Sequence, residues 1–440
     1  MLAVAETFSR FITNSRAAAI ASIVLCSSAP ILMAADGWDD HNRSDRFFSV
    51  DSGKNYLASC ARDGILYTGG DNDTFMLWYA QEVEEYRTDL RVVVLSYYNT
   101  DWYIEQSMQK MNDSEPFKYT LSLYDYRQGG PNDYLPFVDL KIPKIDAAQY
   151  LDLLKKNHPQ LRNDDRNIVP SRILSVKVDK EKVLKSGIIP EGMDSLVVDE
   201  MQFRLIGGAL EKKDLAFLDL LITNNWERPI YVNHTSLSQF KLDLNPYAIM
   251  EGNTSRILPI RNPNPRKDFV NPDLSYENLV NNCQYRGLDD GSIYYSEDYR
   301  NFVLNHRSSF NSAAQALIDK GDLEKARKAL LFSIEKMADK AIPYDHTAVE
   351  TVNLLLLVGE KERAIEMANI VADRGDEMAT YLIKKGHGLT LELRRNLYIL
   401  GELQTIMLEN GEEELSTKFE EMYDRHVRNL QINNADPSDY

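Results

Sequence analysis

Apolar residues occur along this chain in three patterns, and each pattern predicts a different kind of structure. Near the N-terminus they form one long uncharged run, and between residues 60 and 260 they form short runs separated by Gly, Asn and Asp. From about residue 298 onward they recur at helical spacing. The long run is typical of a membrane-spanning helix, the short runs of buried strands, and the last pattern of amphipathic helices. The sequence therefore predicts an N-terminal hydrophobic helix, an α/β domain and a helical C-terminal domain.

The N-terminal run, residues 17–35, carries no charge across 19 positions. As a helix it reaches about 28 Å, enough to span the hydrocarbon core of a bilayer. Arg10 and Arg16 precede the run and three aspartates follow it, so the positive-inside rule places the N-terminus in the cytoplasm and the remaining residues outside. A cleaved signal peptide is the alternative, because many Ala and Ser residues make the run only weakly hydrophobic. We favour the membrane anchor, and both interpretations export the rest of the chain.

Two short apolar runs, 64–70 (GILYTGG) and 91–100 (RVVVLSYYNT), predict buried strands. Residues 74–87 between them have the apolar spacing of a helix, and 101–111 predict another helix. Continuous apolar strands that are separated by a helix are typical of a βαβ unit with a parallel sheet covered on both faces. The predicted fold class is therefore α/β, with a Rossmann-like, mostly parallel sheet.

Residues 112–170 are rich in Pro, Gly, Asn and Tyr, and predict an insertion or lid over the sheet with a helix near 146–157. Further along, the pattern predicts a strand at 171–179, a helix at 213–225, and a strand at 228–235. Residues 260–275 contain three prolines and are typical of a domain boundary.

The C-terminal part contains an internal repeat. Residues 317–337 align with 355–375 at an offset of 38, which pairs a Gly that ends one helix and a small Ala in the next helix. This is the arrangement of tetratricopeptide-like helical pairs, although the offset exceeds their usual period of about 34 residues. A helical stretch at 389–409 is expected to be a final cap. The expected domains are 1–35 (hydrophobic segment), 36–260 (α/β), 261–297 (linker), 298–430 (helical repeats) and 431–440 (tail).

Charge and cysteine content exclude several classes of function. The formal net charge is −17 and the 50 basic residues form no dense run, so we expect no nucleic-acid partner. None of the three cysteines has the spacing of a metal site, and a disulfide between Cys60 and Cys283 stays an open alternative. No P-loop, GxSxG, GxGxxG or HExxH motif occurs.

The stretch GGDNDT, residues 69–74, follows the first predicted strand and suggests two interpretations. Asp71 and Asp73 flank Asn72, and in a doubly wound sheet ligands bind at the carboxyl ends of strands, so the two acids are a candidate site for a divalent cation. A strand followed by Asp-x-Asp also looks like the metal motif of GT-A glycosyltransferases. The alternative is helix capping, with Asp73 or Thr74 as the N-cap, and this is the interpretation that we favour. We expect no bound cofactor.

Two further stretches are candidate recognition loops. Asn99, Asp101 and Trp102 follow the second strand, and if the two strands are parallel neighbours these residues share one sheet edge with residues 71–74. Asp101 as an ordinary N-cap is the alternative. The other loop carries a Trp beside amides and a guanidinium, which suits stacking on a sugar ring, although a helix C-cap explains it as well. Its residues are Asn224, Asn225, Trp226 and Arg228.

Several stretches taken together resemble a known family. They are GWDDHNRS (37–44), the segment 65–96, NTDWYIEQ (99–106), YRQGGPNDYLP (126–136) and TNNWERPIYV (223–232). They look like the C-terminal soluble half of a bacterial polytopic membrane family that was long described as a domain of unknown function. That family is related to the eukaryotic protein O-mannosyltransferases, which carry a GT-C-type membrane half and tetratricopeptide repeats.

The resemblance implies an extracytoplasmic, periplasmic region held at the inner membrane through residues 17–35. The catalytic acid of such families lies in an early loop of the membrane half, and no residue here matches it, so no catalytic residue is carried over. We therefore expect an accessory region that binds an acceptor protein or glycan and works with a membrane half encoded separately. The alternatives are a self-contained metal-dependent glycosyltransferase that uses Asp71 and Asp73, and a tetratricopeptide-like interaction scaffold.

Overall fold

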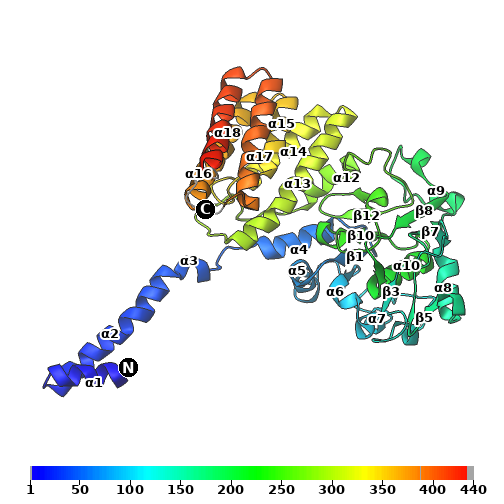
Figure 1. The fold of residues 1–440 in the computed structure, drawn as a ribbon, viewed down its shortest axis with the longest axis horizontal. Helices are drawn as coiled ribbons and strands as arrows, with labels where there is room; N and C mark the ends of the chain where they lie inside the picture. The colour runs from blue at the N-terminus through cyan, green and yellow to red at the C-terminus, as the bar shows by residue number, and fades with distance from the viewer. Residues whose placement is uncertain (1, 387, 434–440) are drawn as a thin grey trace.

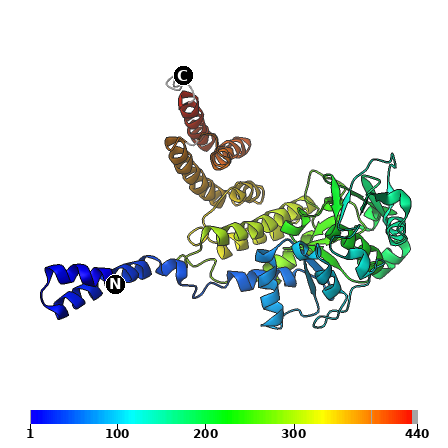
Figure 2. The same ribbon diagram turned by 60° about the horizontal axis from the view of Figure 1, so that its bottom comes forward.

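A computed structural model describes residues 2–386 and 388–433 of the chain (Figure 1). Three N-terminal helices project away from the rest of the molecule in both views (Figures 1 and 2). The second of them has 22 residues and a mean hydropathy of 2.0, and only 11% of its apolar window is buried. Its length and composition suit a membrane span, and a signal sequence would have the same properties. The three helices are α1 (Leu2–Phe11), α2 (Ser15–Asp36) and α3 (Trp38–His41).

The main sheet has five strands in the order β11-β12-β10-β1-β2. β1 (Ile65–Thr68) pairs in parallel with β2 (Arg91–Val94) and with β10 (Ile230–Val232), and β12 and β11 add an antiparallel edge. All residues of the three parallel strands are buried, which explains why these strands are mostly apolar. The predicted class is therefore confirmed: an α/β domain with parallel strands, one N-terminal apolar helix before it and a helical region after it. The antiparallel strands are β11 (Ala248–Met250) and β12 (Ser255–Ile257).

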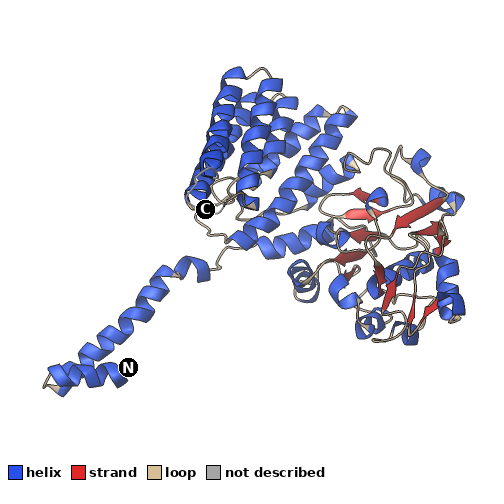
Figure 3. Cartoon of the chain, viewed as in Figure 1, coloured by secondary structure: helices blue, strands red, loops and turns tan. Residues whose placement is uncertain are grey.

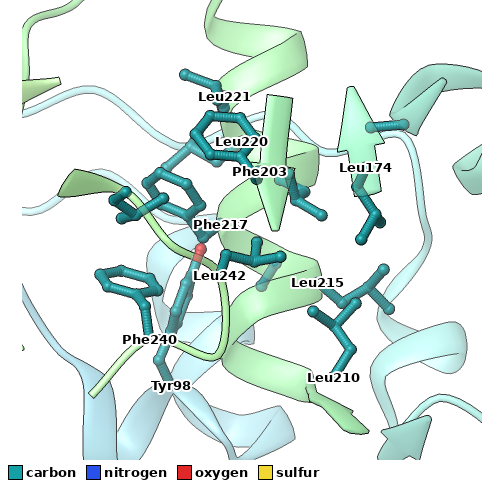
Figure 4. Packing of buried hydrophobic residues seen from close by; sticks show 14 of the residues in the cluster. Tyr98, Leu174, Phe203, Leu210, Leu215, Phe217, Leu220, Leu221, Phe240 and Leu242 are labelled. Atoms are coloured by element: carbon teal, nitrogen blue, oxygen red, sulfur yellow. The ribbon is translucent and has the colours of Figure 1, made fainter. Parts of the chain in front are cut away.

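Alternate residues of the strands face two different cores. Leu66, Val92 and Tyr231 face a smaller core under α4 (Phe48–Ala58) and α5 (Asp71–Glu82). Neighbouring strand residues face the larger core beneath α10 (Lys212–Asn224), which Figure 4 shows from close by. There the Phe217 ring lies 4.8 Å from Phe240 and 5.5 Å from Tyr67, measured between centroids.

Residues 108–211 build smaller sheets beside the main one rather than a plain lid. The strand predicted at 171–179 forms as β7 (Ile173–Lys177), but it pairs with β4 and β8 and not with the main sheet. The other strands of this region are β3 (Tyr134–Pro136), β4 (Ile145–Asp146), β5 (Arg162–Asn163), β6 (Arg166–Asn167), β8 (Glu200–Arg204) and β9 (Ala209–Glu211). Its helices are α8 (Ala147–Lys155) and α9 (Lys180–Ser186), with 3₁₀ turns at Leu123–Tyr126, Pro159–Leu161 and Asp194–Leu196.

Short elements connect the sheet to the helical region. They are α6 (Leu95–Tyr98), α7 (Asp101–Ser107), α11 (His234–Leu237), a 3₁₀ turn at Asn245–Tyr247, α12 (Pro272–Tyr276) and a π-helical turn at Glu277–Asn282. Cys60 and Cys283 both lie in this part of the molecule as free, buried thiols, so the disulfide between them is not formed. Burial raises the pKa of each thiol to about 12.

The C-terminal region consists of antiparallel helical hairpins, separate from the strands (Figure 3). In the two aligned repeats, Gly321 and Gly359 each follow a helix with φ near +85°, a conformation that favours glycine. The aligned alanines, Ala326 and Ala364, are both fully buried. The helices are α13 (Glu297–Lys320), α14 (Leu323–Lys336), α15 (Thr347–Leu357), α16 (Lys361–Lys384), α17 (Leu391–Glu409) and α18 (Glu413–Asn433).

The prediction that 389–409 is a final cap is wrong, because α17 pairs with α18 as a third hairpin. The same helix ending recurs there: Glu412 N donates to the Met407 carbonyl at 2.9 Å, as Asp322 N does to Leu317. Gly411 has φ +76° and the small, buried Ser416 replaces the repeated alanine. Residues 434–440 of the predicted tail lie outside the described residues.

His306 connects the first hairpin (α13 and α14) to the α/β domain through two hydrogen bonds. It is 1% exposed on α13, with Nδ1 2.9 Å from Asn253 Oδ1 and Nε2 3.0 Å from Ser52 Oγ. The amide oxygen can only accept, so Nδ1 carries the hydrogen and Nε2 accepts from the serine. Burial lowers the pKa of His306 to about 4, which keeps the ring neutral.

This buried ring makes stability depend on pH. The unfolded histidine takes up a proton near pH 6.5, whereas the folded one resists protonation until about pH 4. Stability is therefore complete above pH 6.5 and falls as the pH drops toward 4, by on the order of 3 kcal/mol. Denaturant unfolding of the wild type and of His306→Gln at pH 7 and pH 4.5 should show a smaller loss in the variant. Equal losses would contradict this role, because all other groups titrate in both proteins.

Candidate functional site

The parallel strands β10, β1 and β2 present their carboxyl ends at one edge of the sheet. Each end continues directly into a helix: α11 after β10, α5 after β1, and α6 after β2. β1 lies between β10 and β2, so this is the point where connections depart to both sides, and ligands of open α/β sheets bind at such points. We refer to the segments 69–75, 95–102 and 233–235 as the carboxyl edge.

Asp73 is buried at the centre of the carboxyl edge. Its side chain is 5% exposed, and its carboxylate accepts from Gly69 N at 3.1 Å, from Asn233 Nδ2 at 3.1 Å and from the Thr235 hydroxyl. A side chain at position 69 would collide with Thr235 and with the Gln239 amide. These contacts make Asp73 a structural link between α5 and α11.

The prediction that Asp73 or Thr74 is the N-cap of α5 is wrong. Gly70 is the N-cap of α5, and Asp73 and Thr74 lie inside the first turn of the helix. Thr74 is fully buried, and its hydroxyl lies 2.6 Å from that of Thr68 and donates to the Gly70 carbonyl at 2.7 Å. Asn72 is exposed beside them.

The two loops that were predicted to share one edge meet at Asp71. The exposed Asp71 carboxylate accepts from the Tyr97 hydroxyl at 3.3 Å, which joins the start of α5 to α6. Asp71 and Asp73 thus have different partners. Among the described residues there is no group of three or more His, Cys, Asp and Glu side chains that could hold a metal ion.

Asn99 and Asp101 hold neighbouring segments in place. Asn99 donates to Glu211 Oε2 at 3.1 Å and accepts from Lys213 N at 3.0 Å, which ties α6 to the start of α10. Asp101 accepts from Gln128 N at 2.9 Å. The interpretation of Asp101 as the N-cap of α7 is wrong, because Thr100 occupies that position.

A partly buried charged cluster next to Asn99 was not predicted from the sequence. Glu211 forms ion pairs with Lys213 and Lys241, and Asp214 accepts from Glu211 N and Lys241 N. Burial raises the pKa of Asp214 to about 6. The only signal in the sequence was the charged run at 211–214, which also has the spacing of a capping box at the start of a helix.

The outer side of the carboxyl edge carries a continuous series of aromatic rings, which we call the aromatic row. Consecutive ring centroids lie 5.4–6.4 Å apart, and the Phe75 and Trp78 rings are stacked. Phe75 is 50% exposed and Trp102 is 53% exposed, so both flank the Asp71–Tyr97 hydrogen bond with open ring surface. The row consists of Phe75, Trp78, Tyr97, Trp102 and Tyr103.

The third predicted recognition loop, residues 224–228, does not lie at the carboxyl edge. Because β10 runs parallel to β1, the residues that precede it lie at the amino ends of the strands, opposite the carboxyl edge. Arg228 donates to the Asp63 carbonyl at 2.8 Å and to the Ser114 hydroxyl at 2.8 Å. Asn225 is the C-cap of α10 in the left-handed conformation, and Asn224 and Trp226 are both at least partly buried. The structure thus brings residues 71–74 and 99–102 together, but not 224–228.

Comparison with known proteins identifies a family. A family model described as TMEM260-associated domain 2 matches residues 49–274, from α4 through the whole main sheet to α12. No curated protein and no solved structure matches the chain. TMEM260 is a protein O-mannosyltransferase-like family. Because the match spans more than half of the 440 residues, the chain belongs to the TMEM260-associated domain 2 family.

Proposed function

We propose that this protein is a membrane-tethered, extracytoplasmic accessory region of an O-mannosyltransferase-like glycosyltransferase, and that it recognises the acceptor protein or its glycan without catalysing transfer. Its family membership supports a role associated with glycosyl transfer. The apolar helix α2 supports a tether at the inner membrane, with the α/β and helical regions in the periplasm. A polytopic membrane half would supply the catalytic acid.

The aromatic row is the observation that carries this proposal. Exposed aromatic rings offer flat apolar surfaces on which the C–H face of a sugar ring stacks, and nearby polar groups fix its hydroxyls. The Asp71 carboxylate and the Tyr97 hydroxyl lie between the two exposed rings, Phe75 and Trp102. Asp73, by contrast, is enclosed by its own protein partners, which favours a structural role over a catalytic one.

Trp102→Ala should weaken the binding of a synthetic O-mannosylated Ser/Thr peptide by roughly tenfold to a hundredfold, because an exposed aromatic anchor contributes about 1–3 kcal/mol. Calorimetric titration of the full chain in lipid nanodiscs measures this affinity. Tyr398→Ala is the matched control, since Tyr398 is 55% exposed on α17, away from the carboxyl edge. Equal affinities of the wild type and Trp102→Ala would refute recognition at the aromatic row.

An interaction scaffold is the second candidate, and the third helical hairpin favours it because three hairpins make a longer array than the two repeats read from the sequence. Large side chains on α16 and α17 are exposed, among them Tyr381 and Tyr398. A scaffold would bind its partner through these helices and would be insensitive to Trp102→Ala.

A further inference from the structure

A concave surface lies between the α/β domain and the first helical hairpin, away from the aromatic row. It is a cleft of about 720 Å³, within the usual range of small-molecule sites. Its walls come from α11, from the turn between β11 and β12, from the proline-rich segment 261–269, and from the middle of α13. The cleft lies on the β10–β12 side of the sheet, whereas the aromatic row lies on the side of β1 and β2.

The α13 wall is polar where helix packing would favour apolar residues. Asn305, Ser308, Ser309 and Ser312 recur at intervals of three and four residues, so they share one face of the helix, and all four line the cleft. Elsewhere on α13 the buried positions include Val303, Phe310 and Leu317. The polar face of α13 therefore lines the cleft and does not pack against another element.

The opposite walls of the cleft also carry polar side chains, together with aromatic rings. Asn253, at the turn between β11 and β12, is 8% exposed, and Tyr56 of α4 is 4% exposed. Phe269 adds a partly buried ring. Amides and hydroxyls beside aromatic surface are the groups that bind the hydroxyls and the C–H face of a sugar.

The charges of the walls indicate a neutral ligand. The two cations Arg261 and Lys267 are matched by two acids, Asp243 and Asp268. Three of the four already have partners: Lys267 binds Asp319 at 2.6 Å, Asp268 accepts from the Ser312 hydroxyl, and Asp243 accepts from Asn245. A balanced wall offers little net attraction to a strongly charged ligand.

We propose that this cleft is a second carbohydrate site, which binds a neutral oligosaccharide through Asn305, Ser308 and the turn that carries Asn253. The inference deepens the proposed function, because it gives the protein a place for an extended glycan chain in addition to the sugar held at the aromatic row. It rests on the recognition role, but it involves none of the residues of that row.

Calorimetric titration of the full chain in lipid nanodiscs with mannotriose tests this site. Ser308→Trp fills the cleft from the exposed surface of α13 and should weaken binding at least about tenfold. Asn301→Trp, at an exposed position of the same helix outside the cleft, should leave the affinity unchanged. Ser308→Trp should cause the same loss in a Trp102→Ala background, in which the aromatic row is disabled, and this separates the cleft from that row. Thermal unfolding of each variant checks that it is folded.

Three results would overturn the proposal. The first is no binding of mannotriose by the wild type, and the second is unaltered binding by a folded Ser308→Trp. The third is tighter binding of mannose 6-phosphate than of mannotriose, weakened by Arg261→Gln, since that would assign the cleft to an anionic ligand. For the neutral ligand, Arg261→Gln should change the affinity by less than about twofold.

Discussion

Asp73→Ala should lower the free energy of unfolding by roughly 3–5 kcal/mol. The buried carboxylate accepts hydrogen bonds from Gly69 N, Asn233 Nδ2 and the Thr235 hydroxyl, and its removal leaves these donors without their partner inside the structure. The link between α5 and α11 is lost at the same time. Denaturant unfolding of the full chain, followed by circular dichroism, measures the change.

Asp71→Ala is the matched control for this prediction. It removes a carboxylate two residues away on the same helical turn, but Asp71 is exposed and has one long hydrogen bond, so the loss should stay within about 0.5 kcal/mol. Similar losses of unfolding free energy for the two variants would show that burial does not determine how much Asp73 contributes to stability. Calorimetric titration with Mn²⁺ adds a second check, because tight binding that both variants abolish would favour the self-contained metal enzyme instead.

Phe217→Ala should cost about 3–5 kcal/mol of unfolding free energy. Phe217 is fully buried between Tyr67 of β1 and Phe240, so truncation leaves a cavity in the larger core (Figure 4). The two rings that contact Phe217 come from separate segments and do not move together into the space.

Phe75→Ala provides the comparison, because it deletes the same side chain where it is 50% exposed on α5. Its cost should be below about 1 kcal/mol, since little surface there is removed from water. If the two phenylalanines gave equal losses of stability by denaturant unfolding, the core around α10 would not be the main support of the sheet.

The main sheet could be predicted because its parallel strands are buried on both faces. Residues 65–67 and 92–95 are continuously apolar, and a helix lies between them in the sequence, which predicts a βαβ unit. The strands of residues 108–211 were mostly missed because they have two to five residues and half-exposed positions that carry little periodicity. The third helical hairpin was missed because Met407 and Ser416 replace the repeated Leu and Ala.

The candidate site was predicted in part, for similar physical reasons. The meeting of residues 71–74 with 99–102 follows from parallel strands alone, but capping depends on one backbone conformation, and Gly70 adopts it instead of an acid. The direction of β10 decides that 224–228 lies at the opposite end, and the long insertion before it hides that direction from the sequence. The aromatic row was missed because Phe75 and Trp78 have the spacing of core residues of a helix, although Phe75 faces solvent.

Hydroxyl-radical footprinting of the full chain, with and without the O-mannosylated peptide, tests the central claim most directly, because it reports which exposed rings the ligand covers. Recognition at the carboxyl edge predicts that Phe75 and Trp102 become protected from oxidation, while Tyr381 and Tyr398 on the helical hairpins stay as reactive as before. Protection of Tyr381 and Tyr398 with no change at Phe75 and Trp102 would contradict the account and would assign recognition to the helical region.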